Sequence, residues 1–289
     1  MPSNTIQWFP GHMAKTRRLI GECLPQIDIL IEVLDARIPR ASRNPEIHRI
    51  AGNKPILTLL NKASLASPEE NARWLAAFRA RGEYAVLSDC VNGDGIKHLP
   101  DDIRTILAEK VERYREKGMA GRRLRAMIVG IPNVGKSSLI NRMCGAEKAR
   151  VENRPGVTVA KQWVSTPLGI DLLDMPGVLW PKFDDPIVGE NLAFTGAIKD
   201  NILDVEELAM LLSARLAKVC PDLLCARYKL APSDIDGLDG YDLLSLIGKR
   251  RGMLISGGEC DFRRAANMLL DEFRHATIGR ITLEKPSED

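Results

Sequence analysis

The residues with the clearest chemistry form a glycine-rich loop, Gly130-Ile131-Pro132-Asn133-Val134-Gly135-Lys136-Ser137, of the pattern G-x-x-x-x-G-K-S. An apolar run precedes this loop, and a helical pattern follows it. In such a loop the glycines let backbone N–H groups turn towards a phosphate, the lysine neutralises β- and γ-phosphate oxygens, and the hydroxyl binds Mg²⁺. The pattern therefore predicts a nucleoside triphosphate site formed by Gly130, Asn133, Val134, Gly135, Lys136, Ser137 and Ser138.

A second pattern with phosphate chemistry, Asp174-Met175-Pro176-Gly177, lies downstream at the end of another apolar run. A carboxylate there can support the bound metal, and the Gly177 N–H can reach a γ-phosphate. Thr158 lies in a loop-like stretch between the two patterns, from which its hydroxyl can close over the metal. We therefore expect Ser137, Thr158 and Asp174 around Mg²⁺, with Lys136 and Thr158 acting in catalysis.

The third pattern, Asn61-Lys62-Ala63-Ser64, resembles the guanine-reading Asn-Lys-x-Asp motif of GTPases, except that Ser64 stands where Asp is expected. An aspartate accepts two charge-assisted hydrogen bonds from the guanine edge, each worth about 1.5–3 kcal/mol. A serine offers one neutral bond at shorter reach. We therefore expect weaker and less selective base binding, with Asn61 and Lys62 supporting the loop and stacking on the purine.

The elements that must position these residues alternate between strands and helices. Ser67-Pro68-Glu69-Glu70 has the signature of a helix start, and residues 101–117 predict another helix. Strand, helix and strand in short alternation imply a parallel sheet with helices on its faces. Aliphatic runs predict strands at 27–34, 55–60, 84–87, 126–129, 162–166 and 170–174, whereas 187–199, 204–219, 241–248 and 262–275 fit helices.

The order of the motifs resembles that of the circularly permuted GTPases of the YlqF/RbgA type, which act in assembly of the large ribosomal subunit. The base motif at 61 precedes the phosphate loop at 130, whereas ordinary GTPases have the reverse order. The resemblance also covers residues 8–13, 35–37 and 196–199, and so extends over nearly the whole chain. It implies an α/β fold: a circularly permuted P-loop GTPase domain with a six-stranded, mostly parallel sheet at 1–180, and a mostly helical RNA-binding domain at 181–289.

The resemblance also bears on catalysis. Position 178 is Val, where many GTPases carry the Gln that orients the attacking water, so we expect slow intrinsic turnover. His12 is the family's suggested substitute for that Gln, and fits a helix-entry residue equally well. Asn133 resembles the asparagine that helps hold K⁺ in potassium-stimulated GTPases, although a turn residue is the other interpretation.

A second base-side loop is implied by the resemblance at Ser88-Asp89-Cys90, after the strand predicted at 84–87. We include Asp89 and Cys90 among the nucleotide-binding candidates. Asp89 either contributes an acceptor to the base or is a solvated turn residue.

The charge is distributed unevenly, although the net charge is only +3. Residues 1–180 contain 27 basic and 19 acidic side chains, and residues 181–289 contain 14 and 19. Basic clusters return near the end of the chain, and on their own such clusters are most often solvated faces. The resemblance favours RNA contact instead, and with aromatics at 5% we expect recognition of shape and phosphates rather than base stacking. The resemblance makes ribosomal RNA the expected partner of Lys249, Arg250, Arg251, Arg263 and Arg264, with Arg274, His275 and Arg280 nearby.

The sequence also excludes several classes of protein. The first residues lack the features of a signal peptide, and no apolar run reaches the ~18 residues that cross a bilayer. The six cysteines include no CxxC pair, which disfavours a structural metal or a disulfide framework. We expect a soluble, cytoplasmic and monomeric protein that binds GTP or GDP and the precursor of the large ribosomal subunit.

Two other functions are weighed against this hypothesis. Ser64 and Val178 also fit a degenerate relative that docks on RNA as a scaffold, with weak guanine selectivity and little turnover. A small-molecule P-loop kinase is a weaker interpretation, because no site for an acceptor substrate is apparent.

Overall fold

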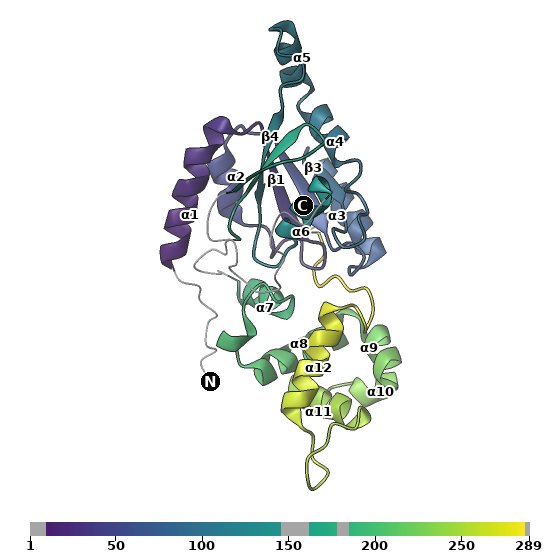
Figure 1. The fold of residues 1–289 in the computed structure, drawn as a ribbon. Coiled ribbons are helices and arrows are strands. Elements are labelled where there is room, and N and C mark those ends of the chain that lie inside the picture. Colours follow the sequence, from purple (N-terminus) through teal and green to yellow (C-terminus); the bar gives the residue numbers. More distant parts are fainter. Residues whose placement is uncertain (1–9, 146–161, 178–184, 287–289) are drawn as a thin grey trace.

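The computed structural model describes residues 10–145, 162–177 and 185–286. Six strands form one sheet in the order β3-β2-β1-β4-β6-β5 (Figure 1). All neighbours pair in parallel except β5, which forms an antiparallel hairpin with β6. The strands are β1 (Ile29–Asp35), β2 (Ile56–Asn61), β3 (Tyr84–Leu87), β4 (Leu124–Val129), β5 (Gln162–Ser165) and β6 (Ile170–Asp174).

The order of the strands in the sheet explains how the two motifs can meet although their order along the chain is reversed. The base motif ends β2 and the phosphate loop follows β4, and both strands lie beside β1 in the sheet. Asp35 at the end of β1 is directly opposite Asn61 at the end of β2, and Asp174 ends β6 on the other side of β4. Parallel strands thus bring residues 35, 61, 130 and 174 to one edge of the sheet.

Helices cover both faces of the sheet because successive strand side chains point to opposite faces. Leu30 packs with α1 and α2, Leu34 packs with α3, and Ile31 on the other face packs with α4 and α6. The helices of this part are α1 (Pro10–Cys23), α2 (Pro45–Ala51), α3 (Pro68–Ala80), α4 (Leu99–Ile106), α5 (Ala108–Glu116) and α6 (Lys136–Cys144), with a short 3₁₀ turn at Leu24–Gln26.

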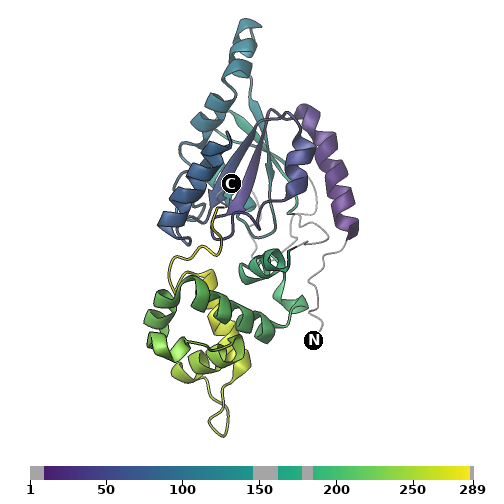
Figure 2. The same cartoon turned by 180° about the vertical axis from the view of Figure 1, so that it is seen from behind.

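The remaining described residues form a helical part at one end of the α/β part (Figures 1 and 2). Its long helix α8 packs against α11 and α12, and α7 lies nearest to the sheet. The helices are α7 (Pro186–Phe194), α8 (Val205–Val219), α9 (Pro221–Tyr228), α10 (Pro232–Ile235), α11 (Gly240–Arg250) and α12 (Phe262–Arg274), with a 3₁₀ turn at Asp200–Ile202. None of the described helices is both long and apolar enough to span a membrane.

The C-terminal segment 280–286 leaves the helical part and returns to the α/β part. Ile281 N donates to Leu65 O at 3.1 Å, and Leu283 N donates to Arg37 O at 2.8 Å. This segment, which we call the C-terminal strap, therefore lies against the loops that follow β1 and β2. The boundary expected near residue 180 falls at 178–184, outside the described residues.

Some predicted helices have different limits in the structure. The helix expected at 101–117 is two helices, separated at Leu107, whose side chain is buried while α5 beyond it buries no residue. The helix expected at 187–199 ends at Phe194, because Gly196 has a φ of 77° that a helix cannot accommodate. Sequence patterns also missed α2, α9 and α10, which are too short to show a helical period.

Candidate nucleotide-binding site

The backbone of the phosphate loop requires glycine at two positions. Gly130 and Gly135 have φ values of 152° and 104°. A Cβ on Gly130 would lie 2.5 Å from the Val33 carbonyl oxygen, and one on Gly135 would overlap the Asn61 side-chain amide. The loop therefore runs between the end of β1 and the base motif, which is why both glycines of the pattern are needed.

Lys136 lies inside this loop with 7% of its surface exposed. Its Nζ donates to the carbonyl oxygens of Gly130, at 3.1 Å, and Ile131, at 2.7 Å. Burial lowers the pKa of Lys136 to about 8, although the nearby Asp174 carboxylate opposes that shift. A Cβ on Gly177 would lie 2.7 Å from Lys136 Nζ, so both phosphate patterns meet at this ammonium group. Phosphate oxygens can replace the two carbonyls as its acceptors.

Asp174 is the residue that best fits a metal. It is 4% exposed, and its Oδ1 is a buried oxygen for which the described residues provide no hydrogen-bond partner. Burial raises the pKa of Asp174, and Lys136 opposes the shift. A buried carboxylate oxygen without a donor is satisfied by Mg²⁺ or by its water, both of which prefer such hard oxygen ligands. Ser137, in the first turn of α6, and Asp174 therefore fit Mg²⁺.

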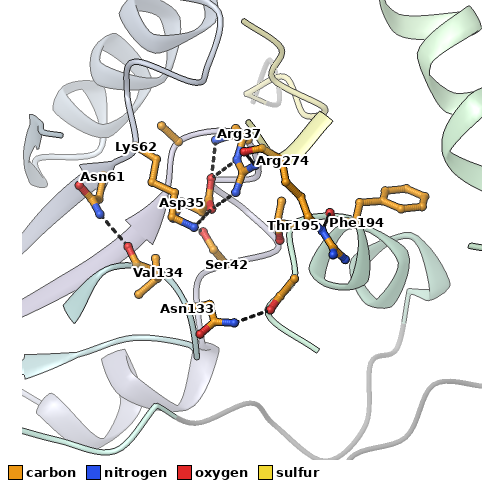
Figure 3. Close-up of polar contacts among 12 residues, drawn as sticks. Asp35, Arg37, Ser42, Asn61, Lys62, Asn133, Val134, Phe194, Thr195 and Arg274 are labelled. Carbon is orange, nitrogen blue, oxygen red and sulfur yellow. Dashed lines mark hydrogen bonds and ion pairs between the residues drawn. The ribbon is translucent and has the colours of Figure 1, made fainter. Parts of the chain in front are cut away.

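Asn61 joins three loops, and Figure 3 shows its bond to the phosphate loop. Its Nδ2 donates to the Val134 carbonyl oxygen at 2.7 Å, and its Oδ1 accepts from Cys90 N at 3.0 Å and from Ser88 Oγ at 3.3 Å. The base motif, the phosphate loop and the segment 88–90 are thus held together by one side chain. The sequence predicted only that Asn61 supports the base loop.

Lys62 has a φ of 59°, a left-handed conformation that is costly for a lysine and is typical of functional sites. Its Nζ lies 3.0 Å from Asp35 Oδ2, and Arg37 pairs with the same carboxylate at 2.7 Å (Figure 3). Burial opposes ionisation of Asp35, yet Arg37 and Lys62 hold its pKa well below the usual range. The pair fixes the Lys62 ammonium group, and stacking of this side chain on a purine stays a prediction.

Ser64 and Asp89 are hydrogen-bonded to each other. Ser64 Oγ donates to Asp89 Oδ2, and Asp89 Oδ1 accepts from Val91 N at 2.9 Å and from Asn92 N at 3.0 Å. Burial opposes ionisation of Asp89, but the hydrogen bond from Ser64 and those from the backbone outweigh it and lower the pKa. Asp89 is 4% exposed, so its interpretation as a solvated turn residue is wrong.

Cys90 contributes its backbone rather than its thiol. The side chain is buried, and burial, followed by the Asp89 charge, raises the pKa of the thiol to about 12. The Arg142 Nε donates to the Cys90 carbonyl oxygen at 3.3 Å, a contact that sequence patterns did not predict.

The residues proposed for catalysis are only partly visible. The backbone of His12 lies in the first turn of α1, and Thr158 and Val178 fall outside the described residues. Asn133 has a φ of 57°, and its Nδ2 donates to the Gly196 carbonyl oxygen at 2.8 Å (Figure 3). The phosphate loop therefore contacts the turn that follows α7.

The predicted basic surface is smaller than the sequence suggests. Arg274 donates to the carbonyls of Phe194 and Ala193, which lie in the last turn of α7, and pairs with Asp200 at 2.7 Å. Arg280 donates to Ala63 O and Ala66 O, both at 2.9 Å. These two arginines are structural, whereas the exposed residues at the end of α11 and the start of α12 are Lys249, Arg250, Arg251, Arg263 and Arg264.

Sequence comparison places this geometry in a known group. Residues 125–221 match the family model described as 50S ribosome-binding GTPase. The chain is 47% identical over 287 residues to ribosome biogenesis GTPase A of Priestia megaterium, with 98% of each chain covered. It is 32% identical over 300 residues to mitochondrial ribosome-associated GTPase 1 of Mus musculus, covering 98% of this chain and 91% of that one.

A solved structure has the same fold. GNP-bound YlqF from T. maritima superposes with a TM-score of 0.64 at 23% identity, covering 95% of this chain and 99% of that one. With 47% identity along almost its full length to one relative and the permuted strand order in its sheet, the chain belongs to the ribosome biogenesis GTPase A family.

Proposed function

We propose that this chain binds and hydrolyses GTP during assembly of the large ribosomal subunit. The GTP-bound form docks on a precursor particle and its rRNA, and hydrolysis releases it. Residues 1–180 are the GTPase domain with an N-terminal extension, and residues 181–289 are the RNA- and ribosome-binding domain. The supporting observation is that the phosphate loop, Asp174 and the base motif meet at one sheet edge, where Asn61 joins two of them.

Each residue of the site has its own proposed role in GTP hydrolysis. Lys136 neutralises phosphate oxygens from a buried position, and Ser137 and Asp174 hold Mg²⁺. When bound there, Mg²⁺ would supply positive charge against the negative charge that develops on the phosphate oxygens. Thr158 closes over the metal and His12 positions the attacking water. Because Val178 supplies no base, turnover is slow until the ribosomal particle is bound.

A monovalent cation is the second element of the proposed catalysis. Asn133 uses its Nδ2 to contact Gly196, and its side-chain oxygen is the group suited to K⁺. We expect hydrolysis to be faster in KCl than in NaCl at equal ionic strength, and equal rates would contradict the role of K⁺.

The test of hydrolysis compares wild type with Lys136→Ala in the presence of precursors of the large subunit. The variant is expected to lose GTP hydrolysis, measured as released phosphate in single-turnover conditions. If Lys136→Ala hydrolyses GTP as fast as wild type, the proposed function is wrong.

The test of docking compares pelleting with ribosomal particles in a non-hydrolysable GTP analogue and in GDP. One variant has Ala in place of four exposed residues, Lys249, Arg250, Arg263 and Arg264. It should bind ribosomal particles more weakly, and its affinity should depend less steeply on salt concentration, since each of these residues contributes a phosphate contact. The matched control replaces the exposed residues Arg113 and Arg115 on α5, and Lys117 directly after it; α5 projects from the far end of the α/β part (Figure 1). Equal association in the GTP analogue and in GDP would favour the alternative that the chain is an RNA-docking scaffold.

A further inference from the structure

We propose that Ser64 and Asp89 together select guanine, with the Asp89 carboxylate supplied from the second loop in place of the aspartate missing at position 64. The inference deepens the proposed GTP-binding function and rests on it. It explains how a chain with a serine in its base motif keeps an acidic acceptor at the base.

The two residues come from neighbouring strands. Ser64 follows β2 and Asp89 follows β3, and Leu60 and Leu87 are partners in the parallel ladder. The two loops are joined by a backbone hydrogen bond of 3.1 Å from Ala63 N to Ser88 O, and Ser88 N donates to Leu60 O at 2.9 Å. This pairing is what brings the Ser64 hydroxyl onto Asp89 Oδ2. A carboxylate on the second loop thus contacts the position where the motif usually places one.

The Ser64–Asp89 pair has hydrogen-bond acceptors left for a base. A carboxylate accepts about four hydrogen bonds. Asp89 Oδ1 takes two backbone N–H groups, Oδ2 takes the Ser64 hydroxyl, and the Ser64 N–H makes a weaker contact with the same carboxylate, so one strong acceptor position is left for a base. Ser64 donates its only proton to Asp89, so its oxygen can act towards a base only as an acceptor, strengthened by the neighbouring charge. The pair therefore presents two acceptors.

Guanine matches this arrangement better than other bases do. Its N1–H and 2-amino group are two adjacent donors, whereas hypoxanthine lacks the amino group and adenine carries an acceptor at N1. Because Asp89 is buried and ionised, each bond to it is charge-assisted and worth about 1.5–3 kcal/mol, or roughly 10- to 100-fold in affinity. We expect GTP to bind more tightly than ITP and ATP by factors of that order.

Asp89 also accepts hydrogen bonds from the backbone of residues 91–92 and so stabilises that turn. The experiment must therefore distinguish this structural role from selection of the base. Asp89→Asn separates the two because the amide keeps the oxygen that accepts from Val91 N and Asn92 N. Its Nδ2 replaces the acceptor Oδ2 by a donor, which suits the 2-carbonyl of xanthine. Selectivity should therefore move from GTP towards XTP while the fold persists.

The experiment measures competition of GTP, ITP, XTP and ATP for a fluorescent GDP analogue, with Mg²⁺ in KCl. Asp89→Asn should lower the GTP-to-XTP affinity ratio by roughly 10- to 100-fold, corresponding to one charge-assisted bond. The swapped variant, with Ser64→Asp and Asp89→Ser together, should retain GTP selectivity, whereas Ser64→Asp alone places two carboxylates in contact and should bind worse. Asp94→Asn, an exposed residue of the same loop, is the matched control and should change nothing.

The outcomes separate this inference from the function on which it rests. If Asp89→Asn keeps the wild-type ratios, or wild type binds all four nucleotides alike, the Ser64–Asp89 pair does not select guanine, and hydrolysis by wild type still supports the proposed function. If wild type binds no nucleotide, both are wrong. A shift towards XTP in Asp89→Asn, with Asp94→Asn unchanged, supports the pair.

Discussion

The Asn61 side chain lies between the base motif and the phosphate loop, 2.7 Å from the Val134 carbonyl oxygen and 3.0 Å from Cys90 N. It is 1% exposed, so water cannot replace these bonds. A single buried amide therefore makes the positions of the base-binding and phosphate-binding loops depend on each other.

Asn61→Ala should weaken both GTP and ITP binding, because it loosens the loops that hold the base and the phosphates while leaving the Ser64 and Asp89 side chains in the chain. It leaves the Val134 carbonyl and the Cys90 N–H without partners, so the free energy of unfolding should fall by about 2–4 kcal/mol. Urea unfolding and nucleotide competition measure the two effects. The control is Asn53→Ala, an exposed residue in the loop before β2, and a loss of selectivity instead of affinity would contradict the assignment.

Asp174→Asn tests the metal site, since the amide is isosteric but carries no charge. Affinity for GTP in excess Mg²⁺ should fall by about 10- to 100-fold, the usual cost of losing a metal-supporting carboxylate. In EDTA the variant and wild type should bind GTP equally. Asp236→Asn, exposed in the helical part, is the control, and a loss that persists in EDTA would show that Asp174 acts on the fold rather than on Mg²⁺.

Lys136 gives the nucleotide-free protein a specific pH dependence. Its pKa falls from 10.5 to about 8 on folding, chiefly through burial. Between these values the unfolded chain holds a proton that the folded chain has released, so stability rises with pH in this window. Relative to Lys136→Met, wild type should gain about 1–2 kcal/mol of unfolding free energy between pH 7 and pH 9.5. Urea titrations of nucleotide-free protein measure this difference, and a constant difference across that range would contradict a buried, charged Lys136.

The sequence predicted the parts of this molecule that depend on local pattern. The aliphatic runs predicted all six strands, because strands covered on both faces need apolar residues on both sides. Gly130, Gly135, Lys136 and Asp174 were also identified correctly as neighbours, since parallel strands end at one edge.

Long-range contacts with no local signature were not predicted. Arg280 resembles any other residue of a basic cluster, and its acceptors, Ala63 and Ala66, lie more than two hundred positions away. Asp89 showed the same limit, because only the pairing of β2 with β3 reveals that it contacts Ser64. The contact of Arg37 with Asp35 could have been predicted, because the two residues lie two positions apart directly after a buried strand.

Glu284 in the C-terminal strap ties the two parts of the molecule together. Its oxygens accept from Arg40 N at 2.6 Å, Ala41 N at 3.1 Å and Asn191 Nδ2 at 2.9 Å, so it links the loop after β1 to α7. Burial raises the pKa of this carboxyl, and the bond from Asn191 and those from the backbone oppose the shift.

Glu284→Ala should therefore lower the free energy of unfolding by about 2–4 kcal/mol, because it leaves the buried donors of Ala41 and Asn191, and the part-buried Arg40 N–H, without this acceptor. It should also weaken nucleotide binding, since the strap holds Ala36 and Leu65 beside the base motif through Thr282 and Ile281. Glu259→Ala, exposed in the loop between α11 and α12, is the control. Urea unfolding and binding of the fluorescent GDP analogue test both effects. A variant with lowered stability and unchanged nucleotide affinity would show that the strap stabilises the fold without shaping the base-binding loop.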